Sequence, residues 1–302
     1  MFKKAERKKA KLKISIIGHS GSGKTLSALL IAKGLGKKIA VVDTENGSAS
    51  LYSDREGVPE FDVLDIKPPF ETEKYSAAIK GAVEGGYDVI ILDSVSHLWS
   101  GTGGLLEQKS MIDRRGGNSY TNWGPVTKKY ESFISDILQS DIHIICTVRS
   151  KEGVEMQKDE RGKSVPVKIG VDPIMRDGFD YEFSLVLEMS HSHEASVRKD
   201  RTGLFDGKIF KPSEEVGTTL MKWLDSGKEP EPVKVEVDPN SVTDEEVKAL
   251  LALIETQEEV KALKDKVKGK FKGELTSMTR NYYDICKAHY LEKVKREVQD
   301  EG

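Results

Sequence analysis

The sequence predicts an α/β protein with a central, mostly parallel sheet flanked by helices, followed by a small helical C-terminal domain. Short apolar, β-branched runs alternate with stretches of helical periodicity up to residue 224. A glycine-rich loop stands between the first strand and the first helix, and prolines and charges replace the apolar runs after residue 226. Strands that are separated by helices pair in parallel, because parallel neighbours need a crossover connection.

The elements of the core are expected in a regular order. Each strand is a short apolar run, and each helix has an apolar face that repeats every three to four residues. Two stretches, 100–121 and 150–180, break this rhythm and are expected to be irregular loops, which in a compact domain are usually functional or disordered. The strands are expected at 12–17, 38–43, 61–66, 87–93, 142–148, 182–189 and 195–197, and the helices at 24–35, 72–84, 123–139 and 213–224.

The chain is expected to divide into four parts. Prolines among charged residues after residue 226 predict a linker, and Thr243 with Glu246 three residues later predicts a capping box that starts a new helix. The expected boundaries are 1–11 for a basic N-terminal arm, 12–226 for the core, 227–242 for the linker and 243–302 for the helical domain.

Composition limits the classes of function. A formal net charge of −3 excludes a globally basic nucleic-acid binder but leaves room for a local basic groove. Cys146 and Cys286 are too few for a disulfide framework, which favours a cytoplasmic location, and Cys146 is expected to be a buried free thiol. The apolar run after the basic arm is too short for a signal peptide or a membrane span, so no membrane association is expected. The arm either contacts phosphate backbones or is a solvated terminus.

The glycine-rich loop is a phosphate-binding motif. It follows a predicted strand and opens a predicted helix, as the Walker A pattern requires. Glycines let backbone N–H groups converge on phosphate oxygens, and the helix N-terminus adds a favourable dipole. Lys24 is expected to reach the β- and γ-phosphates of ATP, and the Thr25 hydroxyl to bind Mg²⁺. The predicted nucleotide-binding residues are Gly18, His19, Ser20, Gly21, Ser22, Gly23, Lys24 and Thr25.

Carboxylates follow two of the predicted strands. Asp93 ends the most hydrophobic strand, where a Walker B aspartate would hold Mg²⁺ together with Thr25. Ser94 follows it, so a residue that orients the attacking water must come from elsewhere, and Glu45 at the end of the neighbouring strand is the candidate. The alternative is that Asp43 and Glu45 only cap a loop.

A further candidate follows the strand at 142–148. Arg149 is expected to contact the γ-phosphate together with Thr147, unless it is an ordinary surface arginine.

These motifs resemble those of the RecA-like ATPases. That family has a Walker A loop, a glutamate in Asp-x-Glu after the second strand, and a Walker B strand ending Asp-Ser; residues 18–25, 43–45 and 93–94 match in the same order. More narrowly, the chain is similar to short phage ATPases with a RecA core, some of which are single-strand annealing recombinases. The resemblance covers about residues 11–224 and implies a RecA-like P-loop NTPase core, ATP with Mg²⁺, a homo-oligomeric ring or filament, and a bacterial host cytoplasm.

The segment 199–203 extends this resemblance. Its Lys-x-Arg-x-Gly pattern is similar to a finger with which RecA-like ring helicases reach the neighbouring subunit's nucleotide, so Lys199 and Arg201 become candidate catalytic residues acting in trans. The alternative is a charged hairpin turn.

The family's DNA-binding loops follow the Walker B strand and the next strand. Basic and aromatic residues in the two irregular stretches therefore become candidate contacts to single-stranded DNA, although Trp123 is equally compatible with the core and acidic residues dilute the second stretch. A single-strand DNA-binding protein is a further possible partner. Two other functions stay open, namely a nucleotide-gated protein-interaction ATPase in phage replication, packaging or host takeover, and a small-molecule kinase. The candidate DNA-binding residues are Arg114, Arg115, Tyr120, Lys158, Arg161 and Lys163.

Overall fold

The computed structural model describes the chain in two compact units. They comprise Met1–Pro230 and Glu231–Gly302. The described residues are 4, 6, 7, 9–158, 164–228, 242–254, 256–271, 275 and 278–300. The predicted linker, 227–242, lies almost entirely outside them.

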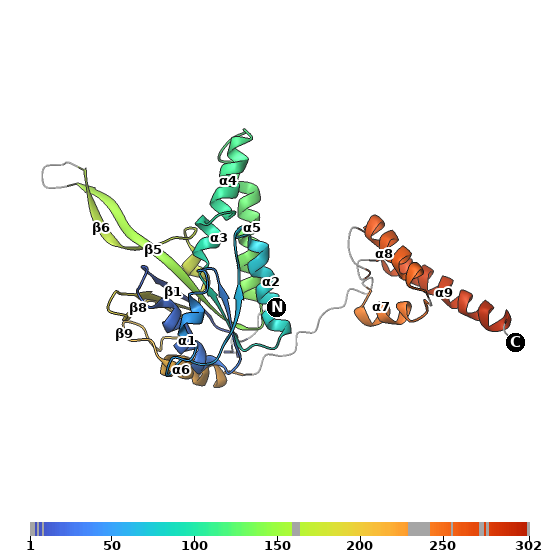
Figure 1. Ribbon diagram of the computed structural model, residues 1–302, viewed down its shortest axis with the longest axis horizontal. Coiled ribbons are helices and arrows are strands. Elements are labelled where there is room, and N and C mark those ends of the chain that lie inside the picture. The colour runs from blue at the N-terminus through green and yellow to red at the C-terminus, as the bar shows by residue number, and fades with distance from the viewer. Residues whose placement is uncertain are drawn as a thin grey trace. The chain divides into compact units, whose positions relative to one another are not determined.

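A mixed sheet forms the centre of the first unit (Figure 1). Its path through the described residues is β3-β2-β4-β5-β1-β7-β8-β9, and β6 pairs with β5 off this path. The pairs from β3 to β7 are parallel, and β6, β8 and β9 join in antiparallel orientation. The strands are β1 (Lys13–Gly18), β2 (Ile39–Asp43), β3 (Asp62–Asp65), β4 (Val89–Asp93), β5 (His143–Lys158), β6 (Ser164–Pro173), β7 (Leu185–Met189), β8 (Ala195–Asp200) and β9 (Ile209–Phe210).

Helices cover both faces of this sheet and bury two apolar layers. In β1, Ile14 and Ile16 pack with α1 and α6, while Ile17 packs on the opposite face with α2 and α5. A strand buried on both faces has no polar alternation, which explains the continuous apolar run in the sequence. The helices are α1 (Lys24–Leu35), α2 (Thr72–Glu84), α3 (Ser96–Ser100), α4 (Leu105–Arg114), α5 (Trp123–Gln139) and α6 (Glu214–Asp225), with short 3₁₀ turns η1 (Ala49–Tyr52) and η2 (Phe179–Glu182).

The fold-class prediction is confirmed, and three helices begin and end where the sequence predicts. These are α1, α2 and α5. The buried free thiol of Cys146 is also confirmed. Its position in the middle of the sheet raises the pKa of that thiol by burial.

Both stretches predicted to be irregular contain regular structure. Residues 100–121 include α4, which packs beside α5. In the second stretch, β5 runs on past the sheet and turns back as β6, so the two strands form a two-stranded ribbon. Figure 1 shows the ribbon and the α4–α5 pair as two separate projections from the core.

Described residues of the basic N-terminal arm contact other parts of the first unit. Lys9 N–H donates to the Lys228 carbonyl at 2.8 Å, and Lys228 N–H donates to the Arg7 carbonyl at 2.9 Å. The guanidinium of Arg7 lies 4.6 Å from the ring centroid of Trp223 on α6. Described residues of the arm are thus held at the C-terminal end of α6.

The second unit is helical. Its helices are α7 (Asp244–Leu251), α8 (Gln257–Phe271) and α9 (Arg280–Asp300). The predicted capping box is confirmed: Thr243 Oγ1 accepts from the Glu246 N–H, and the Glu246 side chain accepts from the Thr243 N–H. Among the helices of the described ranges, none has the length and apolar content needed to cross a bilayer.

Candidate nucleotide-binding site

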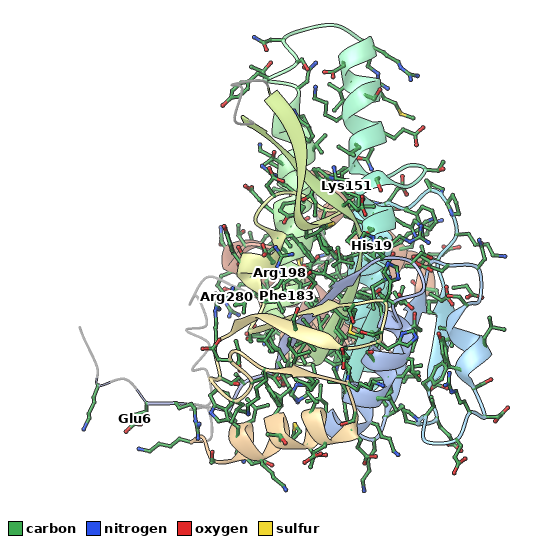
Figure 2. The ribbon with its side chains drawn as sticks, turned by 90° about the vertical axis from the view of Figure 1, so that its left-hand side faces the viewer. Glu6, His19, Lys151, Phe183, Arg198 and Arg280 are labelled. Carbon is green, nitrogen blue, oxygen red and sulfur yellow. The ribbon has the colours of Figure 1, made fainter. Side chains whose placement is uncertain are left out.

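The parallel register brings the predicted motifs to one edge of the sheet. Asp43 is paired with Asp93 across β2 and β4, and Gly18 with Arg149 across β1 and β5. Since the carboxyl ends of parallel strands share an edge, the loop after each strand faces the same space. Figure 2 labels His19 of the P-loop and Lys151 on β5.

The P-loop has the backbone that phosphate binding needs. Gly21 and Gly23 have φ of 76° and 84°, a left-handed region that is strained for residues with a side chain. Gly23 is the N-cap of α1, so the free N–H groups of the first helical turn point into the site. The side chain of Lys24 folds back, and its Nζ donates to the His19 carbonyl at 2.8 Å.

The charge of Lys24 is only partly compensated. Burial lowers the pKa of this lysine, while the nearby charges of Asp93 and Glu45 act in the opposite direction. A bound phosphate would supply a stronger partner than a neutral carbonyl oxygen, because hydrogen bonds between ionised groups are shorter and stronger.

Thr25 and Asp93 form the pair that could hold a divalent cation. The Thr25 hydroxyl donates to Asp93 Oδ2 at 2.6 Å, and the Thr147 hydroxyl donates to Oδ1 of the same carboxylate. Asp93 is 1% exposed, and burial raises its pKa. A cation beside this carboxylate would offset the cost of burying its charge, so the residues present fit Mg²⁺.

The remaining ligands of such an ion are not protein carboxylates. No group of three or more His, Cys, Asp or Glu side chains arranged for a metal occurs among the described residues. Mg²⁺ in nucleotide sites is usually held by one or two protein groups together with phosphate and water, which matches the Thr25–Asp93 pair.

Asp43 and Glu45 have different roles in the loop after β2. The Asp43 carboxylate accepts from the backbone N–H groups of Glu45 at 2.5 Å and Ala49 at 2.7 Å, so it fixes the turn. The side chain of Glu45 instead reaches the pocket and accepts from Arg149 Nε at 2.8 Å. Burial alone would raise the pKa of Glu45, but the hydrogen bond and charge of Arg149 outweigh it and lower the pKa. Glu45 is therefore a carboxylate at neutral pH.

These residues line a single cavity of about 680 Å³. Lys24, Thr25, Glu45, Asp93 and Arg149, all singled out from sequence, belong to its lining. The buried hydroxyl of Ser48, which also lines the cavity, has no hydrogen-bond partner within the described part of the chain. An unpaired hydroxyl and several cations around an open cavity fit a polyanionic ligand such as a nucleotide.

The cavity wall also contains residues that sequence reasoning missed. They come from η1 and its neighbours, from the turn between β7 and β8, and from the segment before α6. An aromatic side chain shortly after Glu45 is a sequence signal that could have pointed to Tyr52. Among the missed lining residues, those with an aromatic ring or a basic group are Tyr52, Arg55, His193 and Lys211.

The predicted finger does not line this chain's own cavity. Lys199 and Arg201 both donate to the backbone carbonyl of Tyr181, Arg201 at 2.9 Å. Lys199 lies in β8, which pairs with β7 in antiparallel orientation, and Arg201 directly follows β8. Their positive charges thus gather at one carbonyl on a different part of the surface.

The candidate DNA-binding residues divide between the two projections. Arg114 is the last residue of α4 and Arg115 its C-cap, and both are exposed. Tyr120, between α4 and α5, is 85% exposed. Trp123, which starts α5, stacks on Trp99 at 6.1 Å and packs against the core. Lys158 ends β5, while Arg161 and Lys163 lie outside the described residues.

Comparison with known proteins identifies the family. The family described as "AAA domain" matches residues 10–221, which contain the whole cavity. A solved structure, "Crystal structure of the RadB recombinase", is similar with 17% identity and a TM-score of 0.43, over 70% of this chain and 91% of that chain. No curated protein matches the chain. Since the family covers more than half of the 302 residues, the chain belongs to the AAA domain family.

Proposed function

We propose that this protein is a Mg²⁺-dependent ATPase that binds single-stranded DNA as a homo-oligomer and acts in recombination or strand annealing. The carrying observation is that Lys24, Thr25, Asp93 and Glu45 line one cavity. A P-loop alone is compatible with many reactions. Hydrolysis of the terminal phosphate also needs a carboxylate in the same cavity as Thr25 and Asp93, the pair that would hold Mg²⁺.

Different groups of this chain would bind the phosphates, the Mg²⁺ ion and the base of the nucleotide. The N–H groups around Gly23 and the Nζ of Lys24 would receive the phosphate oxygens, with Lys24 exchanging the His19 carbonyl for phosphate. Thr25 and Asp93 would hold Mg²⁺, which neutralises charge on the phosphates when bound. Tyr52 offers a ring at the cavity wall on which a base can stack.

Glu45 is the group proposed to orient the attacking water. It is ionised, and an ionised carboxylate accepts a hydrogen bond from water. Arg149 holds it by one Nε–Oε1 contact at 2.8 Å, which fixes the direction of the carboxylate. Rearrangement of this ion pair when the γ-phosphate enters would let Arg149 contact that phosphate, as its position in the cavity wall allows.

The finger and the projections extend the proposal to a second subunit and to DNA. Lys199 and Arg201 lie outside their own cavity, which supports their action on a neighbouring subunit's nucleotide. An arginine that reaches developing γ-phosphate charge raises the rate by roughly 10³–10⁵. The exposed Arg114, Arg115 and Tyr120 combine cations with an aromatic ring, as binding of single strands requires.

ATP turnover with and without single-stranded DNA tests the proposal. We expect Mg²⁺-dependent release of phosphate that rises when DNA is added, and loss of turnover in Lys24→Ala. Binding of DNA is measured in parallel with a non-hydrolysable ATP analogue, Mg²⁺ and low salt. Turnover without any DNA affinity would leave an ATPase that works on a protein partner, and the DNA part of the proposal would be wrong.

A further inference from the structure

The turn between β7 and β8 lies beside the P-loop because of the strand order. β7 pairs in parallel with β1, and the last residues of the two strands, Met189 and Gly18, are register partners. The P-loop leaves one strand and the turn 190–194 leaves the other at the same edge of the sheet. The ring of His191 on this turn stacks on the ring of His19 at a centroid distance of 5.4 Å and an angle of 7°.

His193 brings the turn into the nucleotide cavity. Its Nδ1 lies 2.9 Å from the place that a Cβ on Gly23 would occupy, with Cγ and Cε1 further away at 3.6 and 3.8 Å. The imidazole therefore packs against Gly23 through its Nδ1 edge, and Nε2 is not among the atoms nearest to that glycine. His193 also lines the cavity that contains Lys24 and Thr25.

The backbone at His193 adopts a conformation that residues with a side chain seldom take. Its φ is 61°, in the left-handed region, and glycine would adopt it without steric cost. The turn is nevertheless well ordered by its own hydrogen bonds. His193 N–H donates to the Ser190 carbonyl at 3.1 Å, and Ser190 N–H donates to the Glu194 carbonyl at 2.8 Å. Unusual backbone at a residue that faces a ligand cavity is typical of functional positions.

We propose that His193 is a further binding residue of the nucleotide pocket, donating from Nε2 to the phosphate chain. This inference rests on the proposed function, since it assigns a further ligand to the same nucleotide. The stack of His191 on His19 holds the turn against the P-loop, so the imidazole is placed before the nucleotide binds. Preplacing the donor lowers the cost of ordering the site on binding.

The test distinguishes the contribution of the imidazole to nucleotide affinity from the effect of the left-handed backbone on stability. His193→Gly removes the side chain and relieves the left-handed φ, so the variant should melt at the same temperature as the wild type or higher. Its affinity for a fluorescent ATP analogue with Mg²⁺ should nevertheless fall by roughly tenfold, as expected for loss of a hydrogen bond to a charged group. His193→Asn, which tolerates the same φ but carries a shorter side chain, should lose affinity in the same way.

Two further variants make the outcome unambiguous. Asp54 has φ of 59° and is not part of the cavity wall, so Asp54→Gly relieves the same backbone conformation and should leave the affinity unchanged. Lys24→Ala should abolish binding. If the wild type does not bind the analogue, the proposed function itself is wrong. If the wild type binds and His193→Gly or His193→Asn binds equally well, His193 is only a turn residue and this inference is overturned.

Discussion

Arg149 donates from Nε to Oε1 of Glu45 at 2.8 Å, and this contact joins the end of β2 to the point where β5 leaves the sheet. The backbone N–H of Arg149 also donates to the Ser96 hydroxyl at 2.9 Å, at the start of α3. The residue proposed to orient water is therefore connected to the bases of both projections. A ligand that moves the ribbon would act directly on the partner of Glu45.

Replacing Glu45 tests its proposed role in hydrolysis. Glu45→Gln keeps the size of the side chain but removes the negative charge, so turnover of ATP should fall by roughly 10²–10⁴. Binding of ATP with Mg²⁺ should change by less than about threefold, because Glu45 binds neither the proposed cation nor the phosphates. Single-turnover phosphate release and equilibrium binding check the two parts. The exposed Glu60 supplies the control, since Glu60→Gln should keep wild-type turnover. Full turnover in Glu45→Gln would assign the role to another residue.

Two glycines let α1 and α6 approach closely. A Cβ on Gly34 would lie 2.2 Å from the Glu214 carbonyl oxygen, and one on Gly217 would lie 2.2 Å from that of Ile31. Gly34→Ala and Gly217→Ala must push the helices apart, and each should lower the free energy of unfolding by about 1–3 kcal/mol. Gly81 on α2 has open space around it, so Gly81→Ala should raise that free energy by roughly 0.5–1 kcal/mol. Urea denaturation compares the three, and equal stability would show that the helices tolerate the methyl groups.

The elements that sequence predicts well are those with an apolar face. α1, α2 and α5 each pack on the sheet, and their periodicity and ends are visible in the residues. The ribbon of β5 and β6 extends past the sheet, and its sequence at 150–173 is rich in charges, which obscured the apolar alternation of Val165, Val167, Ile169 and Val171. α4 is short and lies between glycines, which hid its helical pattern. In both cases the sequence carried a pattern, but surrounding charges or glycines outweighed it in the prediction.

The candidate site was also predictable only in part from the sequence. The P-loop, Asp93 and Glu45 follow strands whose order along the chain already suggests a shared edge. His193 becomes a neighbour of the P-loop only because β7 pairs with β1, and these strands are separated by five others along the chain. Spacing in the sequence carries no information on such a pairing. Its contact with Gly23 therefore had to come from the structure.

A buried histidine should make the core sensitive to acid. His143 is 4% exposed, and its Nδ1 accepts from the Leu12 N–H at 3.0 Å, which requires the neutral ring. Burial, with smaller contributions from Lys11 and Lys13, lowers the pKa of His143 to about 4. Between pH 6.5 and about 4 the unfolded state binds a proton that the folded state does not, so stability is lost as pH falls through this window. The lowered pKa of His143 corresponds to a loss of about 3 kcal/mol in the free energy of unfolding across this window.

Urea denaturation at pH 7 and pH 4 checks this prediction. In His143→Asn the amide oxygen takes the place of Nδ1 as acceptor, so the variant should lose about 3 kcal/mol less than the wild type across the window. His289→Asn, at an exposed histidine of α9, should behave as the wild type does. An acid response of His143→Asn equal to that of the wild type would contradict the assignment.

The arginines at the end of α4 should contribute to DNA affinity through charge alone. Arg114→Ala with Arg115→Ala should weaken binding of single-stranded DNA and reduce the slope of log affinity against log salt by about 1–2. The exposed neighbours Lys37 and Lys38, directly before β2, provide a pair of equal charge away from the carboxyl edge of the sheet. Lys37→Ala with Lys38→Ala should leave both quantities unchanged. Equal effects of the two pairs would mean that DNA is attracted by the overall charge and not by α4.

The trans action of Arg201 can be tested by mixing two inactive proteins. Arg201→Ala should lose roughly 10³ in turnover but keep nucleotide binding, whereas Lys24→Ala should lose binding. In a mixed oligomer, the Lys24→Ala subunit still carries Arg201 and can serve the intact P-loop of its neighbour, so part of the activity should return. Arg198 on β8, the strand just before Arg201, pairs with Glu188 at 3.6 Å (Figure 2 labels it), and Arg198→Ala should stay active alone.

The outcomes of this mixing experiment separate the possible positions of the finger. Recovery of turnover requires that the two residues come from different subunits, because neither variant has both in one chain. Two inactive variants that do not complement each other would place Arg201 at its own subunit's nucleotide or in the fold, where it donates to the Tyr181 carbonyl. Full activity of Arg201→Ala alone would leave segment 199–203 as the charged turn that follows β8, and the evidence for shared active sites would disappear with it.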